Sequence, residues 1–117
     1  MISIEAIVRP ERVSQVTAAL VEAGSPGFYY YNITGQGRQH GVEVFVGRGG
    51  QMATRSTVPK TLIRTVVNDD QKDAIVAAIV ASAKGAGEGA IGDGKIFVSQ
   101  VEDAVRVRTG DHGLAAI

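Results

Sequence analysis

The sequence predicts a single α+β domain of the ferredoxin-like class, in the order strand, helix, strand, strand, helix, strand. Two segments repeat apolar residues at spacings of three and four, which is the period of an amphipathic helix. Four short segments alternate or concentrate β-forming residues, and each helical segment falls between two of them. A length of 117 residues, 44% of them hydrophobic, suits one domain, spanning 1–117, with one core.

The first half of the chain begins with a strand, since apolar residues occupy every second position from Ile2 to Val8. Pro10 suits the first turn of a helix, where its missing N–H costs nothing, and Gly24 is a natural end for that helix. The expected inner face of this helix carries Val13, Val16, Ala19, Leu20 and Ala23. Residues 28–33 contain three consecutive tyrosines and predict the second strand.

The second half repeats the pattern with a strand at 62–67 and a helix capped by Asn68 or Asp69. The expected inner face of this second helix carries Ala74, Ile75, Ala78, Ile79 and Ser82. Glycines at 85, 87 and 89 end the helix, and residues 96–98 predict the fourth strand. Residues 101–107 are expected to add a short helical turn and a further extended piece.

A long loop between the second and third strands, about residues 36–59, interrupts these periods. Glycines recur through it, and the brief alternation of Val42, Val44 and Val46 indicates a short extended arm. Loops of this length inside a compact domain are usually functional or disordered. Both helices of a ferredoxin-like domain cover the same face of the sheet, so the other face needs a partner, and a homo-oligomer is the economical one.

Composition excludes several function classes. Lys and Arg number 12, as do Asp and Glu, and this balance argues against a general nucleic-acid binder. The chain has no cysteine, which excludes disulfides, thiolate catalysis and Cys-ligated zinc. His40 and His112 are interpreted as two surface histidines. We expect a cytoplasmic protein without membrane insertion, because the N-terminus lacks a signal-peptide pattern and the longest apolar stretch, 74–81, is too short to span a bilayer.

Three glycine-containing segments could contact phosphate. They are Gly35 to Gly41 after the second strand, Ile91 to Val98, and Val105 to Gly110. The second could cradle phosphate on backbone N–H groups beside Lys95, and the third carries two arginines at period two, which point the same way. Taken singly, each has a plainer interpretation: a loop hinge, a tight turn, or an exposed edge with solvated charges.

In combination and order, the stretches GQGRQHG, PKTLIRTVV and IGDGKIFVSQVEDAVRVRTG, with the N-terminal IEAIVRPERVSQVTAALVEAG, resemble the PII family of signal-transduction proteins over nearly the whole chain. The resemblance implies a homotrimer that binds ATP or ADP in clefts between subunits. The residues it implies for nucleotide binding are Gly35, Gly37, Arg38 and Gln39 beside the phosphates, Gly92, Asp93, Gly94 and Lys95 in the phosphate turn, Arg106 and Arg108 from the neighbouring subunit, and Val66 by the adenine.

The resemblance also implies that 2-oxoglutarate binds beside Mg-ATP. Gln39 would be the protein ligand of magnesium, and Lys60 would pair with a carboxylate of the keto acid. Magnesium prefers oxygen ligands and commonly accompanies phosphates, so the assignment is chemically sensible. Implied protein targets are an ammonium transporter, glutamine synthetase, nitrogenase or another metabolic protein, contacted through the long loop.

Four positions depart from the family pattern. Gln36 stands where phenylalanine is usual, and Tyr29 replaces a threonine that contacts adenine. The turn before Ile91 is about three residues longer by inspection of the sequence, and the long loop contains no tyrosine for uridylylation, although Ser56 lies in it.

Four functions compete at this stage. A nitrogen regulator is favoured by Gln39 and Lys60, which occupy the keto-acid positions. The alternative is a PII-like carbon-state or adenylate sensor that does not bind 2-oxoglutarate, responding to adenylates and perhaps bicarbonate. An enzyme is disfavoured because no acid–base pair or nucleophilic histidine emerges. An amino-acid-binding domain of the same fold is disfavoured by the phosphate-directed lysine and arginines.

Overall fold

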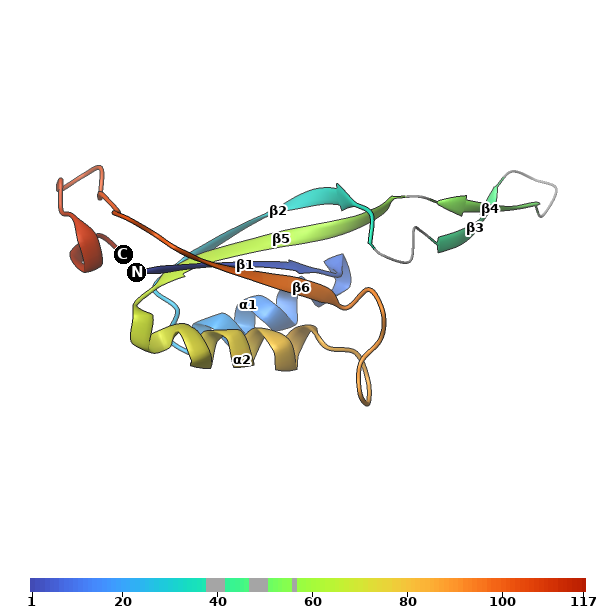
Figure 1. The fold of residues 1–117 in the computed structure, drawn as a ribbon, viewed down its shortest axis with the longest axis horizontal. Coiled ribbons are helices and arrows are strands. Elements are labelled where there is room, and N and C mark those ends of the chain that lie inside the picture. The colour runs from blue at the N-terminus through green and yellow to red at the C-terminus, as the bar shows by residue number, and fades with distance from the viewer. Residues whose placement is uncertain (38–41, 47–50, 56) are drawn as a thin grey trace.

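The computed structural model describes residues 1–37, 42–46, 51–55 and 57–117, with backbone only in the two middle ranges. Figure 1 shows the elements in chain order. They are β1 (Ile2–Val8), η1 (Pro10–Arg12), α1 (Val13–Glu22), β2 (Phe28–Gly35), β3 (Val42–Val46), β4 (Gln51–Arg55), β5 (Val58–Val67), η2 (Asp69–Gln71), α2 (Lys72–Ala83), β6 (Gly94–Gln100) and η3 (Gly113–Ala116).

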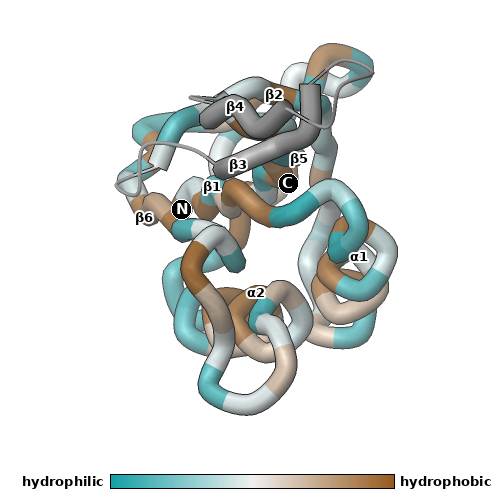
Figure 2. Tube along the Cα trace, turned by 90° about the vertical axis from the view of Figure 1, so that its right-hand side faces the viewer, coloured by the Kyte–Doolittle hydropathy of each residue, from teal (hydrophilic) through white to brown (hydrophobic). Residues whose placement is uncertain are grey.

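The main sheet has the strand order β2-β5-β1-β6, with every neighbouring pair antiparallel. Both helices cover one face of this sheet, and Figure 2 shows them side by side beneath it. The fold is therefore the α+β, ferredoxin-like one that the order of periodic segments predicts. Within the described ranges, no helix is both long enough and apolar enough to cross a bilayer.

The core lies between the sheet and the two helices. Each strand of the central pair contributes its alternate residues, such as Ile4 from β1 and Ile63 from β5, both at most 1% exposed. Leu20 of α1 and Ile75 of α2 close the core from below. Burial of each such side chain contributes about 1.5–3 kcal/mol. The apolar face of each strand (period two) and of each helix (period three to four) therefore turns toward the core.

The second helix differs from expectation at one position of its inner face. Ala74 is exposed, whereas Ile75, Ile79 and Ala83 are buried. Alanine and β-branched residues surround α2 on all sides, so the local pattern does not define which stripe faces the sheet. Its start follows the expectation, because the Asn68 and Gln71 side chains form a capping box at η2.

The long loop contains a second, two-stranded sheet. Strands β3 and β4 pair from Val42 opposite Arg55 to Val46 opposite Gln51, and the hairpin projects away from the body at one end of the main sheet (Figure 1). The expected extended arm is thus confirmed for the backbone. Strand β5 begins at Val58, four residues before the predicted 62–67 segment, because it pairs with β2 as far as Gly35.

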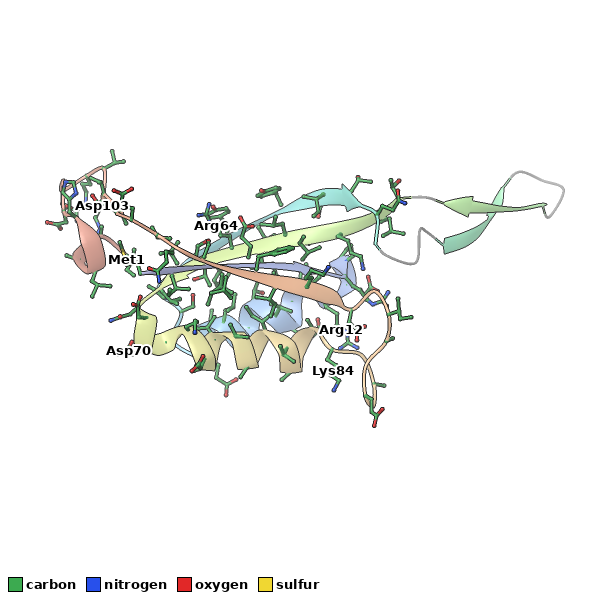
Figure 3. All side chains as sticks on the ribbon, viewed as in Figure 1. Met1, Arg12, Arg64, Asp70, Lys84 and Asp103 are labelled. Atoms are coloured by element: carbon green, nitrogen blue, oxygen red, sulfur yellow. The ribbon has the colours of Figure 1, made fainter. Side chains whose placement is uncertain are left out.

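The face of the main sheet opposite the helices is open. One row across it joins Tyr29, Arg64, Glu5 and Phe97 on successive strands, and Arg64 points away from the helices in Figure 3. Tyr29 and Phe97 are about half exposed, at 51% and 52%. Half-exposed aromatic side chains on a sheet face, here at the two edges of a row whose middle is Arg64 and Glu5, are what a partner surface would cover.

The C-terminal segment lies at the opposite end of the sheet from the hairpin (Figure 1). It leaves β6 where the amide of Val101 bonds to the carbonyl of Met1 at 3.0 Å. The prediction of a helical turn within 101–107 is wrong, because that segment forms a loop with an isolated bridge between Val105 and His112. The helical turn comes later, at η3, after the loop has closed.

Candidate functional site

A cleft of about 730 Å³ opens on the free face of the sheet, where the projecting hairpin leaves β2 and β5 and where β6 begins. It is lined by Ile7, Ile33, Gly35, Gln36, Gly37, Val58, Lys60, Ile91, Gly92, Gly94, Lys95 and Phe97. The cleft thus brings together glycines from two separate segments, two lysines from different strands and Gln36, beside the apolar side chains of Ile7, Ile33 and Phe97. Concave sites of this kind suit a ligand with one apolar and one anionic part.

The glycine turn that enters β6 requires glycine for steric reasons. Gly92 and Gly94 have φ values of 96° and 132°, in the region that side chains disfavour. A Cβ atom at Gly94 would lie 2.0 Å from the backbone oxygen of Ile7. This close approach to β1 fixes the turn against the sheet, with its backbone lining the cleft.

Asp93 organises the loop that precedes this turn. Its Oδ2 accepts hydrogen bonds from the amides of Gly85 and Ala90, both at 2.8 Å, and its Oδ1 lies 3.3 Å from Nε of Arg9. These amide bonds, followed by the bond from Arg9, lower the pKa of the Asp93 carboxyl to about 2. The side chain is thus engaged within the loop, and Asp93 would meet a ligand through its backbone.

Arg9 ties the end of β1 to the same loop. Besides Asp93, its Nη2 donates to the carbonyl of Ile91 at 2.8 Å. Sequence reasoning missed this residue, because its partners lie more than 80 positions away and a single arginine after a strand carries no local signal. Figure 3 shows the region at the end of the sheet nearest Arg12.

Lys60 links the base of the hairpin to the glycine turn. It lies opposite Ile33 in the β2–β5 pairing, and its Nζ donates to the carbonyl of Gly92. Burial and the nearby Arg9 guanidinium lower the pKa of the Lys60 ammonium, while Glu11 and Asp93 act in the opposite direction. Lys95, opposite Ile7 in the β1–β6 pairing, supplies the second ammonium of the cleft.

The predicted site residues fall into two groups at opposite ends of the sheet. The first group surrounds the cleft and comprises Gly35, Gly37, Lys60, Gly92, Asp93, Gly94 and Lys95. Val66 pairs with Ser3 near the other end, and Arg106 and Arg108 follow β6 there. The seven residues of β6 separate the groups by roughly 20 Å. Arg38 and Gln39 lie outside the described residues.

Comparison with known proteins defines the class to which this fold and cleft belong. A sequence profile described as "Nitrogen regulatory protein P-II" matches residues 1–111. "Nitrogen regulatory protein P-II 2" of Methanothermobacter thermautotrophicus is 44% identical over 118 aligned positions, covering 100% of this chain and 97% of that protein. "Nitrogen regulatory protein P-II" of Mesorhizobium japonicum is 43% identical, with 100% of both chains covered.

A solved structure agrees. The crystal structure of Arabidopsis thaliana PII bound to citrate superposes with a TM-score of 0.77 at 34% identity, covering 99% of this chain and 91% of that one. The class is that of small signal-transduction regulators, and this chain belongs to the nitrogen regulatory protein P-II family. Proteins of this family are regulators rather than enzymes, bind ATP or ADP and small effectors, and act as trimers on protein targets.

Proposed function

We propose that this chain forms a cytoplasmic homotrimer that binds ATP or ADP between subunits and, with Mg-ATP, 2-oxoglutarate, and that it controls a nitrogen-metabolism target through residues 36–59. The single observation that carries the proposal is the separation of the cleft lysines from Arg106 and Arg108 by the length of β6. Residues this far apart in one subunit can contact one nucleotide only if a neighbouring subunit supplies the arginines.

The open face of the sheet supports the trimer. Tyr29 and Phe97 stand half exposed in a row with Arg64, on the face that no helix covers. Packing of three such faces around a common axis would bury these side chains. The same packing would bring one subunit's C-terminal segment toward the next subunit's cleft.

The chemistry of the cleft fits a phosphate chain. Lys60 and Lys95 supply compact positive charges, and the turn at Gly92 and Gly94 brings the backbone close to whatever occupies the cleft. The apolar wall formed by Ile7, Ile33 and Phe97 leaves room for a part of the ligand that is not charged.

For the keto acid, Lys60 is the expected partner of a carboxylate and Gln39 is the expected protein ligand of magnesium. Magnesium would be held mainly by the phosphates, since it keeps oxygen ligands and takes few from protein. The ammonium transporter, glutamine synthetase, nitrogenase or another metabolic protein remains the target class of this proposal.

A second candidate function is an adenylate or carbon-state sensor that does not bind 2-oxoglutarate. The observation in its favour is the Lys60 ammonium, which already donates to the Gly92 carbonyl. A keto acid would have to displace the bond from Lys60 to Gly92, whereas a sensor of adenylates alone would retain it in every ligand state.

A calorimetric titration separates the two functions. 2-Oxoglutarate is titrated into protein saturated with Mg-ATP and, separately, with ADP, using the parent, Gln39→Ala and Lys60→Ala. The nitrogen-regulator proposal expects binding with Mg-ATP only, weakened by either substitution. If 2-oxoglutarate does not bind to the parent saturated with Mg-ATP, the adenylate or carbon-state sensor is favoured.

A further inference from the structure

A small loop after β6 is closed at its neck by Asp103 and His112. Nδ1 of His112 lies 2.7 Å from Oδ2 of Asp103. The other carboxylate oxygen accepts the amides of Ala104 and Gly113, at 2.9 and 3.2 Å. One carboxylate thus joins the start of the loop to its end, at the extremity of the molecule where Figure 3 labels Asp103.

Backbone hydrogen bonds order the inside of the loop. The amide of Gly113 bonds to the carbonyl of Ala104 at 2.9 Å, and the amide of Arg106 bonds to the carbonyl of Asp111 at 2.9 Å. Gly110 then bonds back to the carbonyl of Arg106 at 2.7 Å, which makes the tip. Arg106 is therefore held on both backbone sides, and its Nη1 lies 3.7 Å from Oδ2 of Asp111.

We propose that Asp103 and His112 are positioning residues that hold the loop carrying Arg106 and Arg108 in its phosphate-binding shape, so that nucleotide affinity depends on the protonation of His112. The inference rests on the proposed function, which assigns the phosphates of a neighbouring subunit's nucleotide to these two arginines. Asp103 and His112 themselves touch no ligand in this account.

The electrostatics of the neck make the closure sensitive to pH. The hydrogen bond from His112, followed by those from backbone amides, lowers the pKa of the Asp103 carboxyl, so this partner stays ionised at neutral pH. Imidazole side chains gain their charge near neutral pH, and a charged donor makes the stronger bond to a carboxylate. Other charged groups at this end of the molecule include Glu102, Arg106, Arg108, Asp111, Asp69, Asp70 and the Met1 amino group.

The size of the effect follows from exposure. The side chains of His112 and Asp103 are 66% and 48% exposed, and exposed ion pairs contribute little. We expect loss of the charge on His112 to weaken ATP binding by about twofold to fivefold. Asp103→Ala should cost more, about tenfold, because it also removes the acceptor of two backbone amides.

The test is ATP affinity at about pH 5.5 and about pH 8, on either side of imidazole titration. The trimeric parent is compared with His112→Gln, which cannot charge, His112→Lys, which stays charged, and Glu102→Gln as a neighbouring control. Nucleotide phosphates also titrate in this range, but equally for all four proteins. Between the lower and the higher pH, we expect the parent and Glu102→Gln to lose more ATP affinity than His112→Gln does. We expect His112→Lys to lose no more than His112→Gln.

A second measurement reports on the loop directly. Amide hydrogen exchange at Arg106 should be faster in His112→Gln than in the parent while the core amides stay protected. A parent that binds ATP with the same affinity ratio between the two pH values as His112→Gln would overturn the inference and leave the proposed function standing. A parent that binds no nucleotide at either pH would overturn the proposed function, and this inference with it.

Discussion

Lys60 donates a hydrogen bond to the carbonyl of Gly92, which joins the base of the projecting hairpin to the glycine turn before β6. The two residues are 32 positions apart: Lys60 lies on β5, and Gly92 lies in the turn that precedes β6. An anionic ligand that pairs with the Lys60 ammonium must replace the hydrogen bond from Lys60 to the Gly92 carbonyl. The contact therefore gives a physical route by which an anion in the cleft could alter the end of residues 36–59, where the long loop rejoins the sheet.

The open sheet face predicts the oligomer. We expect a mass of about three times the 12.2 kDa chain by light scattering in dilute buffer. Leu62→Glu places a charge on the open face, between Ile7 and Tyr31, and should yield folded monomers. Val80→Glu, on the exposed side of α2, is the matched control and should stay trimeric. A well-folded monomeric parent would contradict the inter-subunit site.

Gly94→Ala tests the steric requirement of the glycine turn. The added Cβ would meet the Ile7 oxygen at 2.0 Å with φ at 132°, so the backbone must move. We expect the free energy of unfolding to fall by about 3 kcal/mol. Gly27→Ala is the control, because nothing lies within 4 Å of its Cβ position. Equal denaturant midpoints for both variants would refute the close approach.

Asp93→Asn tests the carboxylate that organises the 85–93 loop. The pKa of Asp93 is lowered to about 2 in the folded state, against about 3.9 in unfolded chains. Its contribution to stability is therefore complete above about pH 4 and disappears as pH falls toward 2. Thermal melts from pH 7 to pH 2 should show parent and Asp93→Asn converging at acid pH. Asp70→Asn, at an exposed site, should follow the parent throughout.

The long loop predicts an absence of tyrosine modification. All three tyrosines of the chain, Tyr29 to Tyr31, lie in β2, and none occurs from Val42 to Val58. Incubation with a uridylyltransferase and UTP should leave the intact mass unchanged. A uridylyl adduct mapped to the loop would show that another side chain, such as Ser56, is the acceptor.

Local sequence patterns predict the fold better than they predict the site. The alternation of Ile2 to Val8 and the capped helix after Asn68 are short-range features, and both are confirmed. Ala74 was misplaced because α2 is apolar nearly all round. The contacts of Arg9 with Ile91 and Asp93, and of His112 with Asp103, depend on chain closure, which no local period encodes.

The nucleotide assignments of individual residues stay predictions, and Lys95 offers the sharpest of them. It lines the cleft at the start of β6, opposite Ile7. Removal of a charged contact to phosphate costs about 1.5–3 kcal/mol, which corresponds to about a tenfold to hundredfold loss of affinity. Lys84, on the helix side of the same loop, provides a matched lysine away from the cleft.

The most direct measurement is a calorimetric titration of ATP and of ADP into the parent, Lys95→Ala and Lys84→Ala at equal salt. We expect one nucleotide site per chain, with the same affinity in the parent and in Lys84→Ala for each nucleotide. We expect Lys95→Ala to bind each nucleotide at least tenfold more weakly. Failure of the parent to bind either nucleotide, or equal affinities in parent and Lys95→Ala, would contradict the nucleotide assignment.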